Sequence, residues 1–174
     1  MLAIRLLPYH TSFLEPFIAW RYQLLSVRHN PLQSMTKAEI AKMLESEGSD
    51  LTDLKKYESY RWFVGLDEDV VGNVSLKNIS HGMGYAEIGY GIAEEYSNRG
   101  ITTAAVKLLL DRVFSETILR KLIALVHDEN QGSRRVLEKL GFREEGLLRE
   151  HYLIAGQPVD EVFYGLLRHE WQTT

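Results

Sequence analysis

Hydrophobic residues recur along the chain with two different spacings, and this difference separates predicted helices from predicted strands. Between residues 101 and 114, apolar side chains return at i, i+3, i+4, i+7 and i+8, which places them on one face of an α-helix. These side chains are Val106, Leu109, Leu110, Val113 and Phe114. The spacing therefore predicts an amphipathic helix over 101–114.

Three further helices are predicted from a capping residue, apolar residues at helical spacing and a stop signal. They run from Ser12 towards Leu25, from Thr36 to Gly48 and from Asn130 to Gly141. The first two begin with the spacing of a capping box, which Glu15 and Glu39 complete. Two helices are thus expected before the main sheet.

Short apolar runs bounded by turn residues predict the strands. Their ranges are 3–7, 61–66, 70–76, 85–92, 121–126, 142–152 and 159–167. The order of elements is then β-α-α-β-β-β-α-β-α-β-β, which predicts an α/β fold with a mixed, mostly antiparallel sheet flanked by helices. No repeat or linker interrupts this order, so one domain over 1–174 is expected.

Composition excludes several classes of function. The chain has 174 residues and a formal net charge of −4, and so lacks the basic excess of a general nucleic-acid binder. It contains no cysteine, which excludes disulfides, thiolate metal sites and a cysteine nucleophile. No apolar run approaches the roughly 20 residues of a membrane span, and no secretory signal pattern is present. We expect a soluble cytoplasmic protein with no nucleic-acid or membrane partner.

The predicted strand 85–92 has one almost bare face. Its period of two places Glu87, Gly89 and Gly91 on one side and larger apolar side chains on the other. Glycine weakens a strand, so two at alternate positions indicate close approach of a ligand, or else tight packing or a bulge. From these residues alone, the ligand and the packing interpretations are about equally supported. In the ligand reading, Glu87 stands beside a groove.

A polar loop follows this strand and leads into the helix predicted at 101–114. The first turn of a helix leaves backbone N–H groups without partners, and these groups favour an anion together with the helix dipole. Gly100 would let a phosphate approach the backbone, and Arg99, Thr102 and Thr103 could add contacts. A polar turn without a ligand is the commoner outcome, so this pattern alone is a weak signal.

Segments in the second half of the chain resemble the GNAT superfamily of N-acetyltransferases. Residues 86–92 and 100–104 are similar to its strand and pyrophosphate loop, whose pattern is Gln/Arg-x-x-Gly-x-Gly/Ala. Residues 130–142 are similar to the helix that follows in the family. The tail, 156–171, resembles the branch of ribosomal-protein N-terminal (alanine/serine) acetyltransferases. Residues 1–60 match only in outline, as two helices where the family builds its acceptor cleft.

The resemblance implies acetyl-CoA as the cosubstrate, an amine as the acceptor and no metal. In the family, the strand and the loop hold the cofactor through their backbone, and the following helix adds an asparagine that binds the pantetheine arm. The cofactor-binding residues implied here are Ile88, Tyr90, Ile92, Ser97, Asn98, Arg99, Gly100, Ile101, Thr102, Thr103, Asn130 and Ser133.

The sequence also departs from the family pattern. Ser97 stands where Gln or Arg is usual and Thr102 where Gly or Ala is usual, so we expect a tighter pyrophosphate turn or a lower affinity. Leu137 replaces a tyrosine that protonates the leaving thiolate in many relatives. Gly91 replaces a tryptophan common in this branch, which would widen the acceptor pocket.

Acetyl transfer to an amine requires a neutral amine, stabilisation of an oxyanion and a proton for the leaving thiolate. The resemblance assigns the oxyanion to backbone N–H groups beside residues 88–92, and the proton to Ser133, whose alternative role is that of a small residue at a helix start. Glu87 and His151 compete as the base. Glu87 would need a raised pKa, whereas the ordinary pKa of histidine already suits the task. A dedicated base is not required if the amine loses its proton to water.

The acceptor is left open by the sequence. A protein N-terminal α-amine is the first prediction. A polyamine or aminoglycoside is the second, because an acidic cleft would bind such a cation. An acidic run could form this cleft, although it equally suits a solvent-exposed face; it consists of Glu45, Glu47, Asp50 and Asp53. A non-catalytic acyl-CoA-binding module is the third, because Leu137 lacks the hydroxyl of the family's tyrosine. Dimers are common in the branch that the chain resembles, so a homodimer is also predicted.

Overall fold

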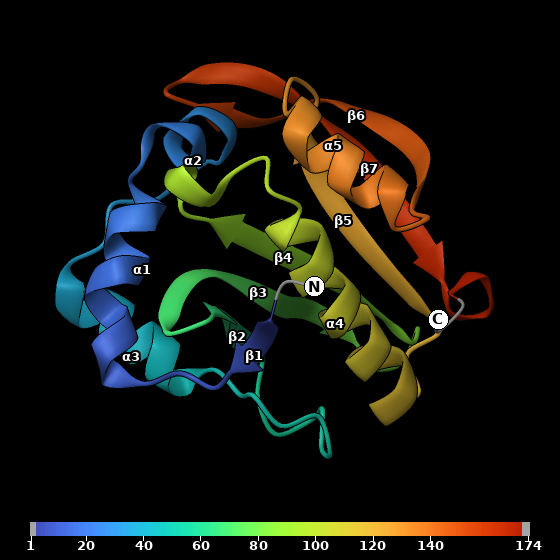
Figure 1. Ribbon diagram of the computed structural model, residues 1–174. Helices are drawn as coiled ribbons and strands as arrows, with labels where there is room; N and C mark the ends of the chain where they lie inside the picture. Colours follow the sequence, from blue (N-terminus) through green and yellow to red (C-terminus); the bar gives the residue numbers. More distant parts are fainter. Residues whose placement is uncertain (1–2, 172–174) are drawn as a thin grey trace.

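The computed structural model describes residues 3–171 and is built around a seven-stranded sheet (Figure 1). The strands are β1 (Ile4–Leu7), β2 (Tyr60–Leu66), β3 (Asp69–Ser80), β4 (Tyr85–Ile92), β5 (Lys121–His127), β6 (Arg143–Ile154) and β7 (Gln157–Leu167). Their order in the sheet is β1-β2-β3-β4-β5-β7-β6, and only the pair β4 and β5 is parallel. The predicted mixed, mostly antiparallel sheet is confirmed.

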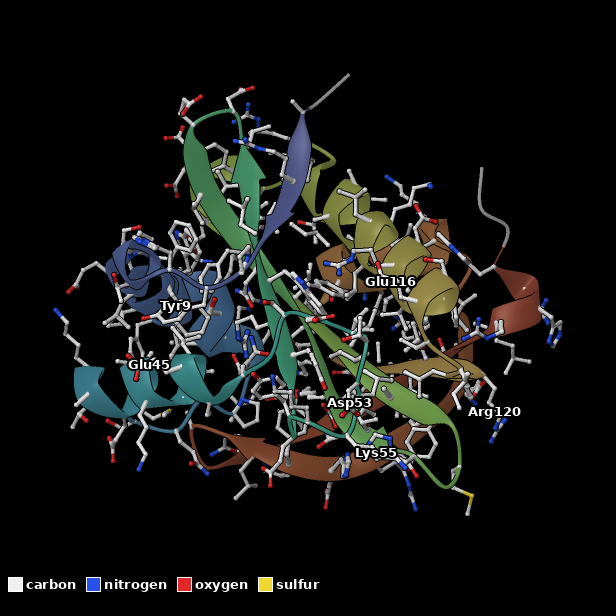
Figure 2. All side chains as sticks on the ribbon, turned by 90° about the horizontal axis from the view of Figure 1, so that it is seen from below. Tyr9, Glu45, Asp53, Lys55, Glu116 and Arg120 are labelled. Carbon is white, nitrogen blue, oxygen red and sulfur yellow. The ribbon has the colours of Figure 1, made fainter. Side chains whose placement is uncertain are left out.

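Helices cover both faces of this sheet. Those before β2 are α1 (Leu14–Arg21), α2 (Leu24–His29) and α3 (Lys37–Ser46), and those after β4 are α4 (Ile101–Glu116) and α5 (Gln131–Lys139). Figure 1 shows α1, α2 and α3 grouped on the left of the view, and α4 and α5 on the right. Figure 2, seen from below, places the sheet between the helix that carries Glu45 and the helix that carries Glu116.

Consecutive residues of β2 point to opposite faces, and the sheet therefore contributes to two hydrophobic cores. Trp62 packs in the core that α4 covers. Phe63, the next residue, packs with Phe17 of α1 and with Ile40 and Leu44 of α3. The apolar face predicted for the helix 101–114 is buried in the first of these cores, which confirms that prediction.

The sheet opens between β4 and β5. The two strands pair only from Tyr85 with Lys121 to Glu87 with Ile123. Beyond this point, in the described residues, β4 continues to Ile92 without a partner on that side, whereas β5 continues beside β7. The split leaves backbone groups of β4 available to a ligand, at the place where the sequence resemblance predicted it.

Of the two helices predicted before β2, the first, from Ser12 towards Leu25, was wrong in its start and in its continuity. The helix begins at Leu14 rather than at Ser12, because the ring of His10 accepts a hydrogen bond from the backbone N of Ser12 and holds a short 3₁₀ turn. It then breaks at Gln23, whose backbone is extended, and restarts as α2. The amide of Gln23 binds Ile92 and Glu94 instead, so a tertiary contact interrupts the helix.

The second predicted helix starts as expected. Thr36 accepts a bond from the backbone N of Glu39, and Glu39 accepts one from the backbone N of Thr36, which confirms the capping box. The helix ends at Ser46, before the predicted stop at Gly48. Gly48 instead forms a bridge with Tyr60, whose ring leaves no room for a side chain there.

Several strands extend beyond their predicted limits. β3 runs to Ser80, and β7 already begins at Gln157. The β6–β7 turn consists of Ala155 and Gly156, whose φ angles are 49° and 79°. Two consecutive left-handed residues are typical of a two-residue hairpin turn, which leaves Gln157 and Pro158 in the strand rather than in the predicted turn.

Among residues 3–171, no helix combines the length and the apolar composition needed to cross a membrane.

Candidate active site

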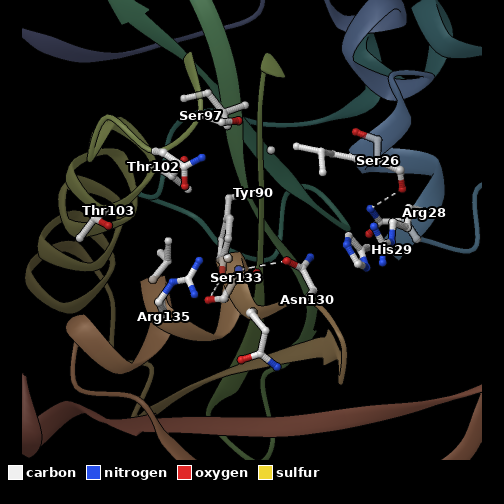
Figure 3. Close-up of a pocket in the computed structure, with 18 of the residues that line it drawn as sticks. Ser26, Arg28, His29, Tyr90, Ser97, Thr102, Thr103, Asn130, Ser133 and Arg135 are labelled. Atoms are coloured by element: carbon white, nitrogen blue, oxygen red, sulfur yellow. Dashed lines mark hydrogen bonds between the residues drawn. The ribbon is translucent and has the colours of Figure 1, made fainter. Parts of the chain in front are cut away.

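A cavity of about 500 Å³ lies beside the split in the sheet, between α2, the end of β4 and the starts of α4 and α5 (Figure 3). Most of the predicted cofactor-binding residues line it: Tyr90, Ile92, Ser97, Asn98, Gly100, Thr102, Thr103, Asn130 and Ser133. Ile88 and Ile101 instead bury their side chains in the core. The guanidinium of Arg99 lies 5.2 Å from the centre of the Tyr96 ring.

The start of α4 is open to the cavity. Gly100 occupies the N-cap position with φ 77°, and a Cβ added there would meet no atom within 4 Å. Because glycine has no side chain, the N-cap supplies no hydrogen bond to the first turn. The N–H groups of that turn are therefore donors for an anion, next to the hydroxyls of Thr102 and Thr103.

The opposite wall of the cavity is fixed to β4 by Gln23. Its Nε2 donates to the carbonyl of Ile92 at 2.7 Å, and its Oε1 accepts from the backbone N of Glu94 at 3.0 Å. The carboxylate of Glu94 in turn accepts from the backbone N of Leu25 at 2.6 Å. These bonds hold α2 against the loop that follows β4.

Ser133 stands on the α5 side of the cavity and is held by two neighbours. Oδ1 of Asn130 accepts a hydrogen bond from the backbone N of Ser133 at 3.1 Å and caps α5, as predicted. The phenol oxygen of Tyr90 lies 2.7 Å from Oγ of Ser133 and 3.2 Å from its carbonyl (Figure 3). Burial raises the pKa of the Tyr90 phenol above its usual value, against the opposing effect of the bond with Ser133.

Glu87 is buried, but it does not face this cavity. Its carboxylate pairs with Nζ of Lys77 at 2.9 Å and accepts from Nδ2 of Asn78 at 2.6 Å. On the same face, a Cβ added to Gly89 would lie 2.8 Å from Oγ of Ser75. Tight packing therefore accounts for Gly89, whereas Gly91 does line the cavity.

His151 lies on the long β6–β7 hairpin, also outside the residues that line the cavity. Its Nδ1 is 2.8 Å from Oε2 of Glu161, and its side chain is 45% exposed. Burial raises the pKa of Glu161, while the charge of His151 lowers it. The charge of Glu87 also raises the pKa of Glu161, as expected for two carboxylates on the same face of the sheet.

In the part of the chain that the structure describes, no group of three or more His, Cys, Asp and Glu side chains is placed so that it could bind a metal ion.

A comparison with sequence families connects this cavity to a known group of enzymes. The model of the acetyltransferase (GNAT) domain matches residues 4–143. The chain belongs to the GNAT family of acetyltransferases. The predicted family, and the acyltransferase class that goes with it, are thereby confirmed.

Two curated relatives carry different acceptors in their names. The chain is 33% identical over 127 residues to spermidine N(1)-acetyltransferase of Escherichia coli (strain K12), which covers 72% of this chain and 68% of that protein. It is 39% identical over 106 residues to YdaF of Bacillus subtilis (strain 168), to which ribosomal N-acetyltransferase activity is assigned provisionally. That second alignment covers 61% of this chain and 58% of YdaF.

Solved structures share the fold over nearly the whole chain. RimJ of Mycobacterium smegmatis, in complex with CoA-disulfide, superposes with a TM-score of 0.81 and 26% identity, covering 98% of this chain and 85% of that one. Spermidine N-acetyltransferase of Vibrio cholerae, in complex with CoA and spermine, gives a TM-score of 0.81 at 22% identity and covers 96% of each chain. These likenesses confirm the predicted GNAT fold.

The departures from the GNAT pattern can now be placed. Leu137, where many relatives carry a tyrosine, is fully buried in the core and cannot serve as a polar group. Tyr90 reaches Ser133 from β4 instead, so a phenol is still present beside the serine. Tyr90 was predicted from the sequence as a cofactor-binding residue, but its contact with Ser133 was not, because the two residues are 43 positions apart.

Two histidines of this GNAT site were not predicted from the sequence. His29, the last residue of α2, lines the cavity, and its Nδ1 lies 2.9 Å from Nδ1 of His127, the last residue of β5. Each histidine is unremarkable in its own segment. They meet only because the fold brings the end of α2 to the end of β5, although the two residues are 98 positions apart in the sequence.

Proposed function

We propose that this GNAT protein transfers the acetyl group of acetyl-CoA to a primary amine. The observation that carries the proposal is one continuous cavity, which runs from the open first turn of α4 to the hydroxyl of Ser133. Its α4 end suits the pyrophosphate, because free N–H groups and the helix dipole stabilise an anion. Its Ser133 end suits the thioester, because a hydroxyl there lies beside the unpaired part of β4.

Each step of the transfer has a candidate group. The acceptor nitrogen attacks the thioester carbon, and backbone N–H groups of residues 88–92 stabilise the oxyanion that forms. The C–S bond then breaks, and the hydroxyl of Ser133 gives its proton to the thiolate and regains one from solvent. Glu87 and His151, the bases predicted from the sequence, have close partners and lie outside the cavity lining, so either would act through water.

The favoured acceptor is a protein N-terminal α-amine. YdaF supports this choice, whereas the spermidine acetyltransferase of Escherichia coli supports a polyamine. The acidic run proposed for a polyamine is largely engaged elsewhere. Glu47 pairs with Arg61, and the carboxylates of Asp50 and Asp53 accept bonds from the backbone N of Thr52 and Lys55. A peptide amine needs no such acidic surface.

One experiment tests the proposal. Calorimetry would first measure binding of acetyl-CoA, and release of free thiol would then follow turnover with a peptide that begins in alanine, its N-acetylated counterpart and spermidine. We expect binding, turnover with the free peptide and none with the blocked one. Turnover with spermidine alone would favour the polyamine alternative. Binding without turnover of any amine would favour the non-catalytic acyl-CoA-binding module.

A cytoplasmic location, a homodimer and the absence of a nucleic-acid partner stay predictions from the sequence. Sedimentation of the purified protein would test the dimer.

A further inference from the structure

The two histidines at the edge of the cavity form one hydrogen-bonded pair. Their Nδ1 atoms are 2.9 Å apart, and the rings are tilted by 52° with centroids 5.2 Å apart. The side chain of His127 is 7% exposed, whereas His29 lines the cavity on the wall opposite Ser133 (Figure 3). A group of this kind joins a buried residue to the space where an acceptor would bind.

The geometry limits where the protons of this pair can be. A bond between two ring nitrogens contains one proton, so one Nδ1 donates and the other accepts. Oδ1 of Asp128 lies 3.4 Å from Nε2 of His127, and an ionised carboxylate favours a proton on that nitrogen. A neutral His127 then has a bare Nδ1, which accepts from Nδ1–H of His29. A neutral His29 is therefore left with a free lone pair on Nε2.

The surroundings favour the neutral form of His29. Burial lowers its pKa most, and the proximity of His127 and Arg28 lowers it further, while Glu129 acts in the opposite direction. The titratable and charged groups around the pair come from α2, the loop after β5, β6 and β7. They are Arg28, Asp128, Glu129, Tyr152, whose hydroxyl lies 3.5 Å from the carbonyl of His29, and Glu161, the register partner of His127.

We propose that Nε2 of His29 takes the proton from the acceptor nitrogen, and that His127 is the positioning residue that fixes its tautomer. This inference rests on the function proposed above. As the nitrogen bonds to the thioester carbon, its surplus proton moves to Nε2 of His29. The C–S bond then breaks and the thiolate takes the proton of Ser133. Ser133 regains a proton from solvent, and imidazolium His29 returns its proton to solvent. The reaction therefore neither gains nor loses a proton.

His29 fits this role better than the two bases predicted from the sequence. It lines the cavity, whereas Glu87 and His151 do not. Those two residues also have partners of opposite charge at 2.9 Å and 2.8 Å. Glu129, the carboxylate that raises the pKa of His29, is itself paired with Arg28.

The first test needs no acceptor. Nitrogen NMR of the imidazoles in the wild-type protein reports which ring nitrogen carries the proton. At pH 7 we expect His29 to be neutral, with its proton on Nδ1 and none on Nε2. A proton on Nε2 of neutral His29, or a charged His29 at this pH, would overturn the inference.

The second test measures kcat/KM against pH with the alanine peptide as acceptor. His29→Gln should lower kcat/KM about 100-fold or more at neutral pH, as removal of a general base does. The loss should shrink as the pH falls through the pKa of His29, which burial holds below its ordinary value of about 6.5, because the wild-type imidazole is then protonated and cannot act as a base. The matched control is His81→Gln, on an exposed turn away from the cavity, which should match wild type. A loss that is equal at every pH would mean a structural role.

Chemical rescue and a pair of His127 variants complete the test. Imidazole in the buffer should restore part of the activity of His29→Ala and none of that lost in Ser133→Ala. His127→Asn keeps an acceptor for Nδ1–H of His29 and should retain more activity than His127→Leu. Affinity for acetyl-CoA, measured for every variant, separates the two proposals. Normal binding with normal kinetics in His29→Gln overturns only this inference, whereas no binding by wild type overturns the proposed function.

Discussion

The phenol oxygen of Tyr90 and the hydroxyl oxygen of Ser133 lie 2.7 Å apart, in a contact that joins β4 to α5 at the wall of the cavity. A phenol, with an ordinary pKa near 10, is intrinsically a stronger acid than a serine hydroxyl, although burial raises the pKa of Tyr90 above that value. The pair can pass a proton from Tyr90 through Ser133 to a departing thiolate. Tyr90 can thus supply the phenol that Leu137 lacks.

Removal of either hydroxyl should slow the chemical step. We expect Ser133→Ala to lower kcat by about 10- to 1000-fold and Tyr90→Phe by a smaller factor, with little change in affinity for acetyl-CoA. The double variant should lose less than the product of the single losses, because the two groups act as one unit. Because burial raises the pKa of Tyr90 above its ordinary value, this effect should not vary between about pH 6 and pH 9.

The matched control for this experiment is Tyr164→Phe. Tyr164 is a buried tyrosine whose hydroxyl bonds Arg134 and Glu138, away from the cavity lining. It should lose stability but keep kcat. Wild-type activity in Ser133→Ala would leave water as the proton donor and return Ser133 to a structural role at the start of α5.

A second prediction concerns the pyrophosphate loop. Gly100→Val should abolish binding of acetyl-CoA, because the branched side chain would project into the open space before α4. The φ of 77° also strains any side chain there. Gly156→Val is the matched control, since Gly156 has φ 79° and equally open surroundings at the β6–β7 turn. Calorimetry should show lost binding only for the first variant, while both lose some stability.

Ligand binding should also raise the melting temperature. Acetyl-CoA binds only the native state, so it should add about 2.7 kcal/mol to the free energy of unfolding at a hundredfold excess over Kd. A thermal scan with and without millimolar acetyl-CoA measures this shift. Free adenosine, which lacks the pyrophosphate and the pantetheine arm, should produce a much smaller one. An unchanged melting temperature would contradict the cofactor assignment.

Elements with strong local signals were predictable from the sequence. The period of 3.6 around Leu109 and Leu110 fixed the buried face of α4, and the alternation in 85–92 fixed β4. The capping box of Thr36 was correct because both partners lie within one turn. That of Ser12 was wrong because His10 and Gln23 make contacts that override the local preference. Local helix propensity is overridden where a tertiary hydrogen bond competes for the same part of the chain.

The same distinction applies to the site. The loop around Gly100 was predictable because its chemistry depends on consecutive residues at a helix start. The predicted role of Glu87 depended on where its side chain points, and the longer β3 places Lys77 and Asn78 against it. Contacts such as Tyr90 with Ser133 arise only from packing between distant elements. No spacing within either segment indicates them.

A last prediction tests how β2 is held to the segment after α3. Arg61 of β2 bonds the buried carboxylate of Glu47 through Nε at 2.6 Å and through a second guanidinium nitrogen at 2.9 Å. Arg61→Ala would leave that carboxylate without its counter-charge, so the free energy of unfolding should fall by about 3–5 kcal/mol. Arg61→Ala combined with Glu47→Gln should recover part of the loss, because no buried charge then remains unpaired.

Lys37→Ala provides the control for this prediction. Lys37 pairs with Glu15 on the surface, where both side chains are about two-thirds exposed, at 65% and 68%. An exposed ion pair contributes little, because water and salt screen it, so its removal should cost less than about 1 kcal/mol. Urea unfolding of the variants measures all of these changes. Equal losses for Arg61→Ala and Lys37→Ala would show that water reaches the Arg61–Glu47 pair and that the pair does not hold β2 to the segment after α3.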